Sequence, residues 1–160
     1  MATSQPPAPP VARTVLDRYH QAMRDKSADG LADLYAMDAV HEFPFPAPGF
    51  PERFEGREEV RAGYRAAWGA SPLRVVEVRD VVVHAATGPD MVIAGHVVVV
   101  ESAGGERARV PGLLIIEVSE GLITRVHDYM DAPAVARAAA SAAGRSWRQV
   151  PAGADGGIGA

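Results

Sequence analysis

The stretch MVIAGHVVVVESAGGERARVPGLLIIEVSEGLITRVHDYMD, residues 91–131, decides the fold. Three runs rich in Val and Ile fill it, and a fourth run of the same kind precedes it. Because β-branched residues favour strands and Gly-containing turns separate the runs, we expect one strand from each run: Leu73–Ala85, Met91–Ser102, Arg107–Ser119 and Leu122–Asp131. Four long strands joined by short turns predict an antiparallel meander.

The part of the chain before these strands shows helical spacing instead. Apolar residues on one face predict helices over Val11–Lys26 and Glu58–Trp68, with a short helix ending at Tyr35 between them. A short strand, Ala39–Phe45, leads into a Pro-rich loop. Helices gathered in one part of the chain and strands in another indicate the α+β class. We expect a strongly curved antiparallel sheet that wraps around the N-terminal helices as a cone with an internal pocket.

The length of the chain indicates one domain. Residues 1–10 include four Pro and are expected to form a disordered arm. The domain is expected over residues 11–143, and its last element is an Ala-rich helix from Pro133 to Ala143. The Gly-rich stretch 144–160 is expected to be a flexible tail.

Composition excludes several classes of function. The 160 residues include no Cys and carry a formal net charge of −4. Disulfides, thiol chemistry and Cys-ligated metals are therefore excluded, and the acidic balance argues against nucleic acid as a partner. No apolar run approaches the roughly 20 residues that a membrane span needs, and the N-terminus lacks the pattern of a signal peptide. We therefore expect a cytoplasmic protein that does not bind membranes.

One acid stands out in the last predicted strand. Strand alternation places Asp128 on the face that also carries Val126 and Met130, and places Ile123 and His127 on the other face. A carboxyl group on an apolar face is costly unless it is paired, hydrogen-bonded or protonated, and perturbed acids cluster at functional sites. We expect Asp128 to act as a catalytic acid or base. An acid at a strand end that is solvated or paired with an Arg fits the same pattern.

Two further polar residues lie on predicted apolar faces. His41 shares a strand face with Ala39, Phe43 and Phe45, a setting that suits a hydrogen-bond donor, an acid or a base in a cavity. Tyr19 lies on the apolar stripe of the first helix, where its hydroxyl needs a partner. Both residues are predicted to be catalytic, although each could equally be a satisfied core side chain.

Aromatic and aliphatic side chains around these groups are expected to line the pocket, because apolar walls are usual in small-molecule sites. The predicted wall residues are Phe43, Phe45, Tyr64, Trp68, Val126 and Met130. The other histidines show no spacing typical of metal ligands, and His20 is expected to turn away from the apolar stripe. No metal site and no cofactor are predicted.

Three segments carry a resemblance to a known family: LADLYAMDAVHEFPF (31–45), FEGREEVRAGY (54–64) and GLITRVHDYMDAP (121–133). With the order of elements, they resemble the SnoaL-like branch of the nuclear-transport-factor-2-like superfamily over residues 11–140. The resemblance implies a curved sheet around three helices, usually dimeric through the sheet. Members include polyketide cyclases, ketosteroid isomerases, limonene-epoxide-type hydrolases and small phenazine-biosynthesis proteins. In the cyclases and phenazine proteins an acid in the last strand moves protons, and Asp128 holds that position here.

The resemblance to ketosteroid isomerase is partial. Tyr19 corresponds to its catalytic Tyr in the first helix, but its general base falls at Phe43, and the neutral Asp of its oxyanion hole falls near Leu114. An epoxide hydrolase would need a second acid and an Arg around a water beside Asp128. The candidate arginines for that role are Arg79, Arg109 and Arg125.

The residues and the resemblance together predict an enzyme that works without a cofactor. Asp128 would move a proton in the cyclisation or isomerisation of a small, apolar, oxygenated metabolite, and His41 and Tyr19 would hydrogen-bond the oxygen that gains charge. Two alternatives stay open: an epoxide hydrolase, and a non-catalytic protein that binds hydrophobic ligands. The resemblance also implies a homodimer formed through the sheet.

Overall fold

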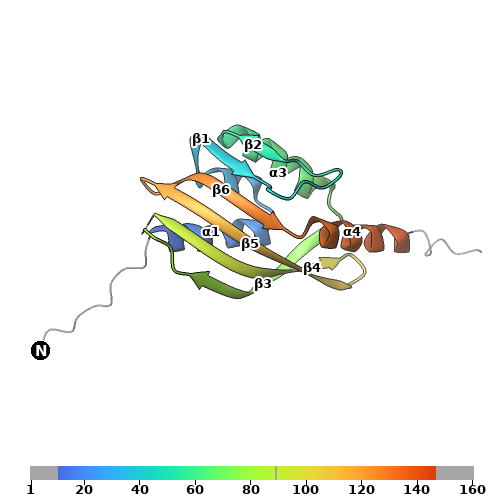
Figure 1. Ribbon diagram of the computed structural model, residues 1–160. Helices are drawn as coiled ribbons and strands as arrows, with labels where there is room; N and C mark the ends of the chain where they lie inside the picture. The colour runs from blue at the N-terminus through green and yellow to red at the C-terminus, as the bar shows by residue number, and fades with distance from the viewer. Residues whose placement is uncertain (1–10, 89, 147–160) are drawn as a thin grey trace, which may run out of the picture.

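A curved sheet with helices packed against it forms the body of the protein in the computed structural model, which describes residues 11–88 and 90–146 (Figure 1). The expected arm at residues 1–10 lies outside the described residues, as does the part of the expected tail from residue 147 onward. Residues 144–146 of that tail belong to the last helix, so the expectation of a flexible tail from residue 144 is wrong there. The elements are α1 (Val11–Asp25), α2 (Ala28–Ala32), β1 (Tyr35–Glu42), β2 (Arg53–Glu55), α3 (Arg57–Ala70), β3 (Leu73–His84), β4 (Met91–Ser102), β5 (Arg107–Ser119), β6 (Leu122–Met130) and α4 (Ala132–Ser146).

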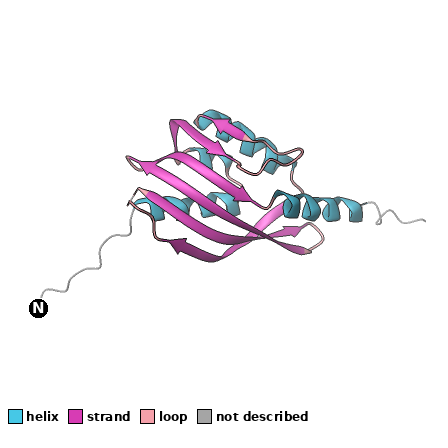
Figure 2. Cartoon of the chain, in the orientation of Figure 1, coloured by secondary structure: helices cyan, strands magenta, loops and turns pink. Residues whose placement is uncertain are grey.

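The sheet confirms the predicted meander and extends it at one edge. Its strand order is β2-β1-β6-β5-β4-β3, and neighbours from β3 to β6 are antiparallel (Figure 2). However, β1 pairs parallel with β6, so the sheet is mixed and the expectation of a wholly antiparallel sheet is wrong. The prediction of loop over Arg53–Glu55 is also wrong, because this short segment gains its strand structure from pairing with β1 rather than from local propensity.

A β-bulge in β6 changes which residues face the interior. Arg125 and Ile123 are two residues apart, but their partners on β5 are the adjacent residues Glu117 and Val118. Thr124 is therefore an extra residue in the ladder, and one extra residue reverses the alternation of side chains beyond it. Ile123 is fully buried, so its predicted orientation, on the face opposite Asp128, is wrong.

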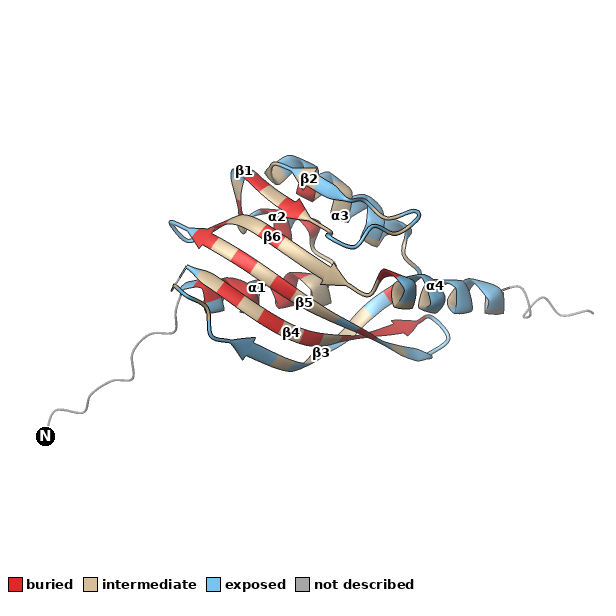
Figure 3. Ribbon diagram, in the orientation of Figure 1, coloured by how far each residue is buried: buried red, intermediate tan, exposed pale blue. Residues whose placement is uncertain are grey.

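Two helices cover the inner face of the sheet. α1 packs against β3, β4 and β5, and α3 packs against β1 and β2. Buried positions alternate with less buried ones along the first part of β4 and the second half of β5, as expected when one face of a sheet meets the core (Figure 3). The last five residues of β4 are all buried. The largest aliphatic side chains that are fully buried in this core are Leu16, Leu31, Val60, Leu114, Ile116, Ile123 and Val126.

The first turns of the chain differ from the prediction at two positions. Tyr35 begins β1 instead of ending α2, which stops after Ala32. Ser27 caps the start of α2 by accepting a hydrogen bond from the Gly30 amide at 3.0 Å. His20 is buried, so the expectation that it turns away from the apolar stripe is wrong. Four residues after Leu16, it lies on the same helix face.

The C-terminal helix packs on a second, smaller core. Leu73, Val98, Val100 and Val110 are its buried members, and alanines of α4 pack against them. Met130 at the end of β6 joins this cluster, and α4 itself packs against β3, β4 and β5.

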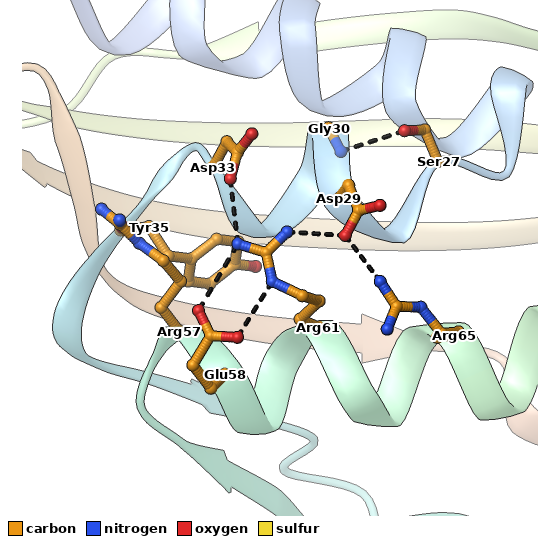
Figure 4. Close-up of polar contacts among 9 residues, drawn as sticks. All are labelled: Ser27, Asp29, Gly30, Asp33, Tyr35, Arg57, Glu58, Arg61 and Arg65. Carbon is orange, nitrogen blue, oxygen red and sulfur yellow. Dashed lines mark hydrogen bonds and ion pairs between the residues drawn. The ribbon is translucent and has the colours of Figure 1, made fainter.

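An ionic cluster on the surface joins α2 to α3 (Figure 4). The Arg61 guanidinium donates to Asp29 at 2.7 Å and to Asp33 at 2.9 Å, both on the α2 side, and to Glu58 at 3.0 Å within α3. Arg65 also donates to Asp29, at 2.7 Å. These contacts fix the rotation of α3, which carries Tyr64 toward the interior.

Candidate functional site

Asp128 and His41 meet on the inner face of the sheet. Their strands are parallel neighbours, with His41 paired to Val126, two residues before Asp128. His41 Nε2 lies 3.5 Å from Asp128 Oδ2, and the Asp128 side chain is only 12% exposed. His41 is fully buried. The structure therefore brings together two of the three residues that the sequence predicts to be catalytic.

Three tyrosine hydroxyls surround this pair. Tyr35 Oη lies 2.7 Å from His41 Nδ1, and Tyr64 Oη lies 3.2 Å from His41 Nε2. Tyr19, the third predicted catalytic residue, joins through Tyr64 at 3.4 Å between the two hydroxyl oxygens. The cluster is continuous from α1 through α3 to β6. Tyr35 is missed by the sequence analysis, because placing it at the end of a helix hides its strand alternation with His41.

The tyrosines are hydrogen-bond donors at neutral pH. Burial raises the pKa of Tyr19, Tyr35 and Tyr64 well above the ordinary value of 10.0, and the negative charge of Asp128 raises each of them further. A protonated phenol can donate to an oxygen that gains negative charge. The cluster thus combines one carboxylate with several uncharged donors.

The contacts of His41 favour one tautomer. An ionised carboxylate accepts hydrogen bonds only, so the Nε2 atom that faces Asp128 is best protonated. Nδ1 then accepts from the Tyr35 hydroxyl at 2.7 Å. In this arrangement Tyr35 holds the His41 ring, and the ring in turn holds the carboxylate of Asp128.

Aromatic rings form one side of the site. The ring centroid of His41 lies 4.6 Å from that of Phe43 and 6.2 Å from that of Phe54, and Tyr64 packs on Trp68 at 4.8 Å. Phe54 is missed by the sequence analysis, because its strand is read as loop. Phe45 does not join this group: it is 66% exposed and packs on Tyr129 at 5.3 Å.

A pocket of about 520 Å³ lies where β6 ends, and its lining includes neither Asp128 nor His41. Met130 lines it, two residues beyond Asp128 on the same strand, and Gly112 of β5 lies beside Met130 in the ladder. The Pro-rich segment after β1 supplies the opposite wall through Phe45, Pro46 and Ala47. Tyr129 and Met130, the two residues that follow Asp128 in β6, therefore both line an apolar pocket.

A second polar pair occupies the interior beside α1. His20 Nε2 and His96 Nδ1 are 3.0 Å apart, and both side chains are buried. Burial, followed by the charge on His96, lowers the pKa of His20 to about 4. This pair cannot be predicted as a pair from the sequence, but His20 alone can be, because it follows the buried Leu16 by four residues on the same helix face.

No group of three or more His, Asp or Glu side chains in residues 11–88 and 90–146 is placed to hold a metal ion. No helix within the described residues is long and apolar enough to cross a membrane.

Comparison with known proteins defines the class of this protein. Residues 16–126 match the SnoaL-like domain family, and the chain belongs to that family. An uncharacterised PhzA/B-like protein of Pseudomonas aeruginosa is 27% identical over 119 residues, which is 74% of this chain and 82% of that protein.

Solved structures show the same fold. A Bacillus subtilis protein assigned provisionally as an isomerase superposes with a TM-score of 0.70 at 25% identity, over 82% of this chain and 94% of that one. A Xanthomonas campestris protein assigned provisionally as a polyketide cyclase gives 0.62 at 22% identity, over 82% and 96%. A Mycobacterium tuberculosis protein in complex with estradiol-17beta-hemisuccinate gives 0.62 at 23% identity, over 78% and 96%. The α+β cone expected from the sequence is confirmed.

Proposed function

We propose that this SnoaL-like protein is an isomerase or cyclase that acts on a small, largely apolar, oxygenated metabolite without a cofactor. The observation that carries the proposal is the position of Asp128. Its carboxylate is almost buried and lies 3.5 Å from His41. The two residues that follow it in β6, Tyr129 and Met130, line an apolar pocket. A buried carboxylate among uncharged donors is suited to moving a proton.

Each residue of the cluster has a role in such a reaction. Asp128 takes a proton from a carbon beside a carbonyl group, and the electron pair of the broken C–H bond moves to the carbonyl oxygen. The hydroxyls of Tyr64 and Tyr19 stabilise the resulting enolate by hydrogen bonds. Protonated Asp128 then returns the proton to another carbon. In a cyclisation the enolate carbon instead attacks a second carbonyl, whose π electron pair moves to its oxygen, and that alkoxide takes the proton from Asp128. His41 positions Asp128.

The comparisons support this reading at the level of reaction class. Two structures of the same fold are assigned provisionally as an isomerase and a polyketide cyclase, and a third holds a steroid ester. A steroid is an apolar, oxygenated, multi-ring molecule of the kind that a pocket of about 520 Å³ suits.

The arginines argue against an epoxide hydrolase mechanism. Arg125 pairs with Glu42 at 3.3 Å, and both Arg79 and Arg109 pair with Asp80. None of these three candidates contacts Asp128, so the Asp–Arg–Asp arrangement around a water is not assembled from them. A protein that only binds its ligand is the remaining alternative, and the experiment below separates it from an enzyme.

We also propose a homodimer. Apolar side chains remain exposed at Phe45, Val82 and Val83, and exposed apolar patches favour association. Sedimentation over a range of concentrations is expected to show a dimer. A monomer at every concentration would exclude it.

The test of the reaction uses 2-tetralone, a two-ring ketone whose α-protons are acidic. Incubation with the protein in D₂O is expected to replace those protons with deuterium, measured by proton NMR. Asp128→Asn is expected to slow the exchange by about a hundredfold or more. Asp38→Asn is the matched control, because Asp38 is exposed on β1. Binding of 2-tetralone without catalysed exchange would favour the non-catalytic alternative.

A further inference from the structure

The His20–His96 pair has no part in the reaction described above, although it lies inside the same cone. His20 comes from α1 and His96 from β4, and their rings meet edge to face with centroids 5.1 Å apart. Only one ring nitrogen of each residue is used in the contact between Nε2 of His20 and Nδ1 of His96. Nε2 of His96 has no hydrogen-bond partner within the part of the chain that the structure describes.

Gly112 makes room for this free nitrogen. It is the residue of β5 that pairs with His96 on one side and with Met130 on the other. A Cβ at position 112 would lie 2.9 Å from His96 Nε2 and 3.4 Å from its Cδ2. Any other residue would therefore displace the imidazole ring, so the glycine lets that ring lie over β5.

The same glycine connects His96 to the site. Gly112 and Met130 both line the pocket of about 520 Å³, and the next inward row of the sheet contains Leu114 paired with Asp128. Burial lowers the pKa of His96, and the negative charge of Asp128 partly offsets this effect, as expected of two groups that share one interior. His96 and Asp128 thus flank one stretch of β5.

The proton is best placed on Nε2 of His96. The bond between the histidines leaves one N–H and one lone pair without a partner, whichever ring donates. An unpaired N–H is the less tolerated of the two when buried, and His96 is the more accessible ring, at 8% exposed against 4% for His20. Donation from His20 Nε2 to His96 Nδ1 places the free N–H over Gly112, a residue that lines the pocket.

We infer that His96 is a second substrate-binding residue, which donates its Nε2 proton to an oxygen of the substrate remote from the reacting carbon. His20 is a positioning residue that fixes the tautomer of His96. The inference rests on the proposed function for the place of the reacting carbon. Asp128 and His96 are two strands apart, about 10 Å across the sheet. The substrate class is therefore a molecule of two or more rings, with oxygen functions on different rings.

The first test compares naphthalene probes that differ in one oxygen. Binding of 2-naphthol, 2,6-dihydroxynaphthalene and 2,7-dihydroxynaphthalene is followed by their fluorescence. The wild-type protein is expected to bind at least one of the diols about tenfold more tightly than 2-naphthol, the gain typical of one buried hydrogen bond. His96→Leu is expected to remove that preference and to leave the affinity for 2-naphthol unchanged. His96→Gln, which keeps an N–H donor, is expected to retain part of it.

The second test leaves the imidazole in place and moves it. Gly112→Ala is expected to weaken diol binding as His96→Leu does, because the methyl group displaces the ring. Gly95→Ala is the matched control on β4, since nothing lies within 4 Å of a Cβ there. This pair of variants decides the question if His96→Leu fails to fold.

The role of His20 has a spectroscopic readout. In ¹⁵N NMR spectra of the imidazoles, Nε2 of His96 is expected to be protonated and Nδ1 unprotonated in the wild type. His20→Leu is expected to mix the two tautomers and to reduce the diol preference.

The outcomes of these tests are separable from those for Asp128. An unchanged diol preference in both His96→Leu and Gly112→Ala would overturn the role of His96 while leaving the exchange reaction untouched. If the wild-type protein shows no diol preference, the role of His96 is likewise rejected. Loss of the preference in these variants, with no effect of Asp128→Asn on exchange, would instead reject the proposed reaction and keep the binding role.

Discussion

The protein contains two polar clusters of opposite character, one inside the cone and one on its surface. The surface cluster joins two arginines to three carboxylates (Figure 4). The interior cluster places one carboxylate, Asp128, among a histidine and tyrosine hydroxyls that are uncharged donors. On the surface each charge has an opposite charge beside it, whereas inside the cone the carboxyl group of Asp128 lies among an imidazole ring and tyrosine hydroxyls.

This difference separates a structural role from a chemical one. Exposed ion pairs contribute little free energy to folding and are screened by salt. A nearly buried carboxyl group with no Lys or Arg side chain paired to it costs free energy, and such costs are tolerated where they serve a function. We therefore expect substitutions in the interior cluster to change activity, and those in the surface cluster to change stability slightly.

The largest effect is expected from a matched pair of Asp→Asn changes. Asp128→Asn should lower the exchange of 2-tetralone about a hundredfold or more without lowering the free energy of unfolding, because an amide costs less to bury than a carboxylate. Asp29→Asn should leave exchange unchanged. Exchange rates and urea unfolding, measured on both variants, check the comparison. Equal effects on exchange would contradict it.

The next effect concerns the buried histidines and pH. The pKa of His20 falls from 6.5 to about 4 on folding, so the unfolded chain binds the proton more readily. The contribution of neutral His20 to the free energy of unfolding is therefore fully present above pH 6.5. It is lost as the pH falls toward 4, and the total loss is on the order of 3 kcal/mol. His20→Gln keeps a side-chain donor but does not titrate. Its unfolding free energy should fall less steeply over this range, and parallel curves for the two proteins would refute the assignment.

A smaller effect is expected from the hydroxyl that holds His41. Tyr35→Phe removes the partner of Nδ1 at 2.7 Å, which should cost about 1–3 kcal/mol of stability and slow exchange through loss of the His41 orientation. Tyr64→Phe should slow exchange with a smaller loss of stability, since its contacts with Tyr19 and His41 are longer, at 3.4 and 3.2 Å. Urea unfolding and exchange rates separate the two hydroxyls.

The sequence predicts the strands and much of the interior cluster, and the reason lies in periodicity. The boundaries of β3 to β6 agree with the prediction to within a residue at each end. Long runs of β-branched residues bounded by Gly strongly favour strands over other structures. Asp128 and His41 were found as polar residues on apolar faces. Phe54 and Tyr35 are not predicted, because both lie in strands that are set by pairing in the folded protein. The local sequence suggests something else: helical spacing before Tyr35, and a Pro-rich loop around Phe54.

Contacts between residues that are distant in the sequence cannot be predicted from strand and helix periodicity. His20 and His96 are 76 residues apart, and nothing local links a helix position to a position on β4. The bulge at Thr124 was invisible for the same reason, since it is defined by the register between β5 and β6. Strand alternation therefore placed Asp128 with Val126 but misplaced Ile123.

The smallest effect is expected in the surface cluster, where the loss of stability on substitution should depend on the salt concentration. Arg61→Gln breaks contacts with Asp29, Asp33 and Glu58, so its urea midpoint should lie slightly below that of the wild type at low ionic strength. In about 1 M NaCl the screening length falls to about 3 Å, and the difference should vanish. Arg57→Gln is the control, because Arg57 donates at 2.7 Å to the carbonyl oxygen of Tyr35, and its deficit should persist in salt. A salt-independent deficit in Arg61→Gln would show that the surface cluster acts through hydrogen bonds, as the interior one does.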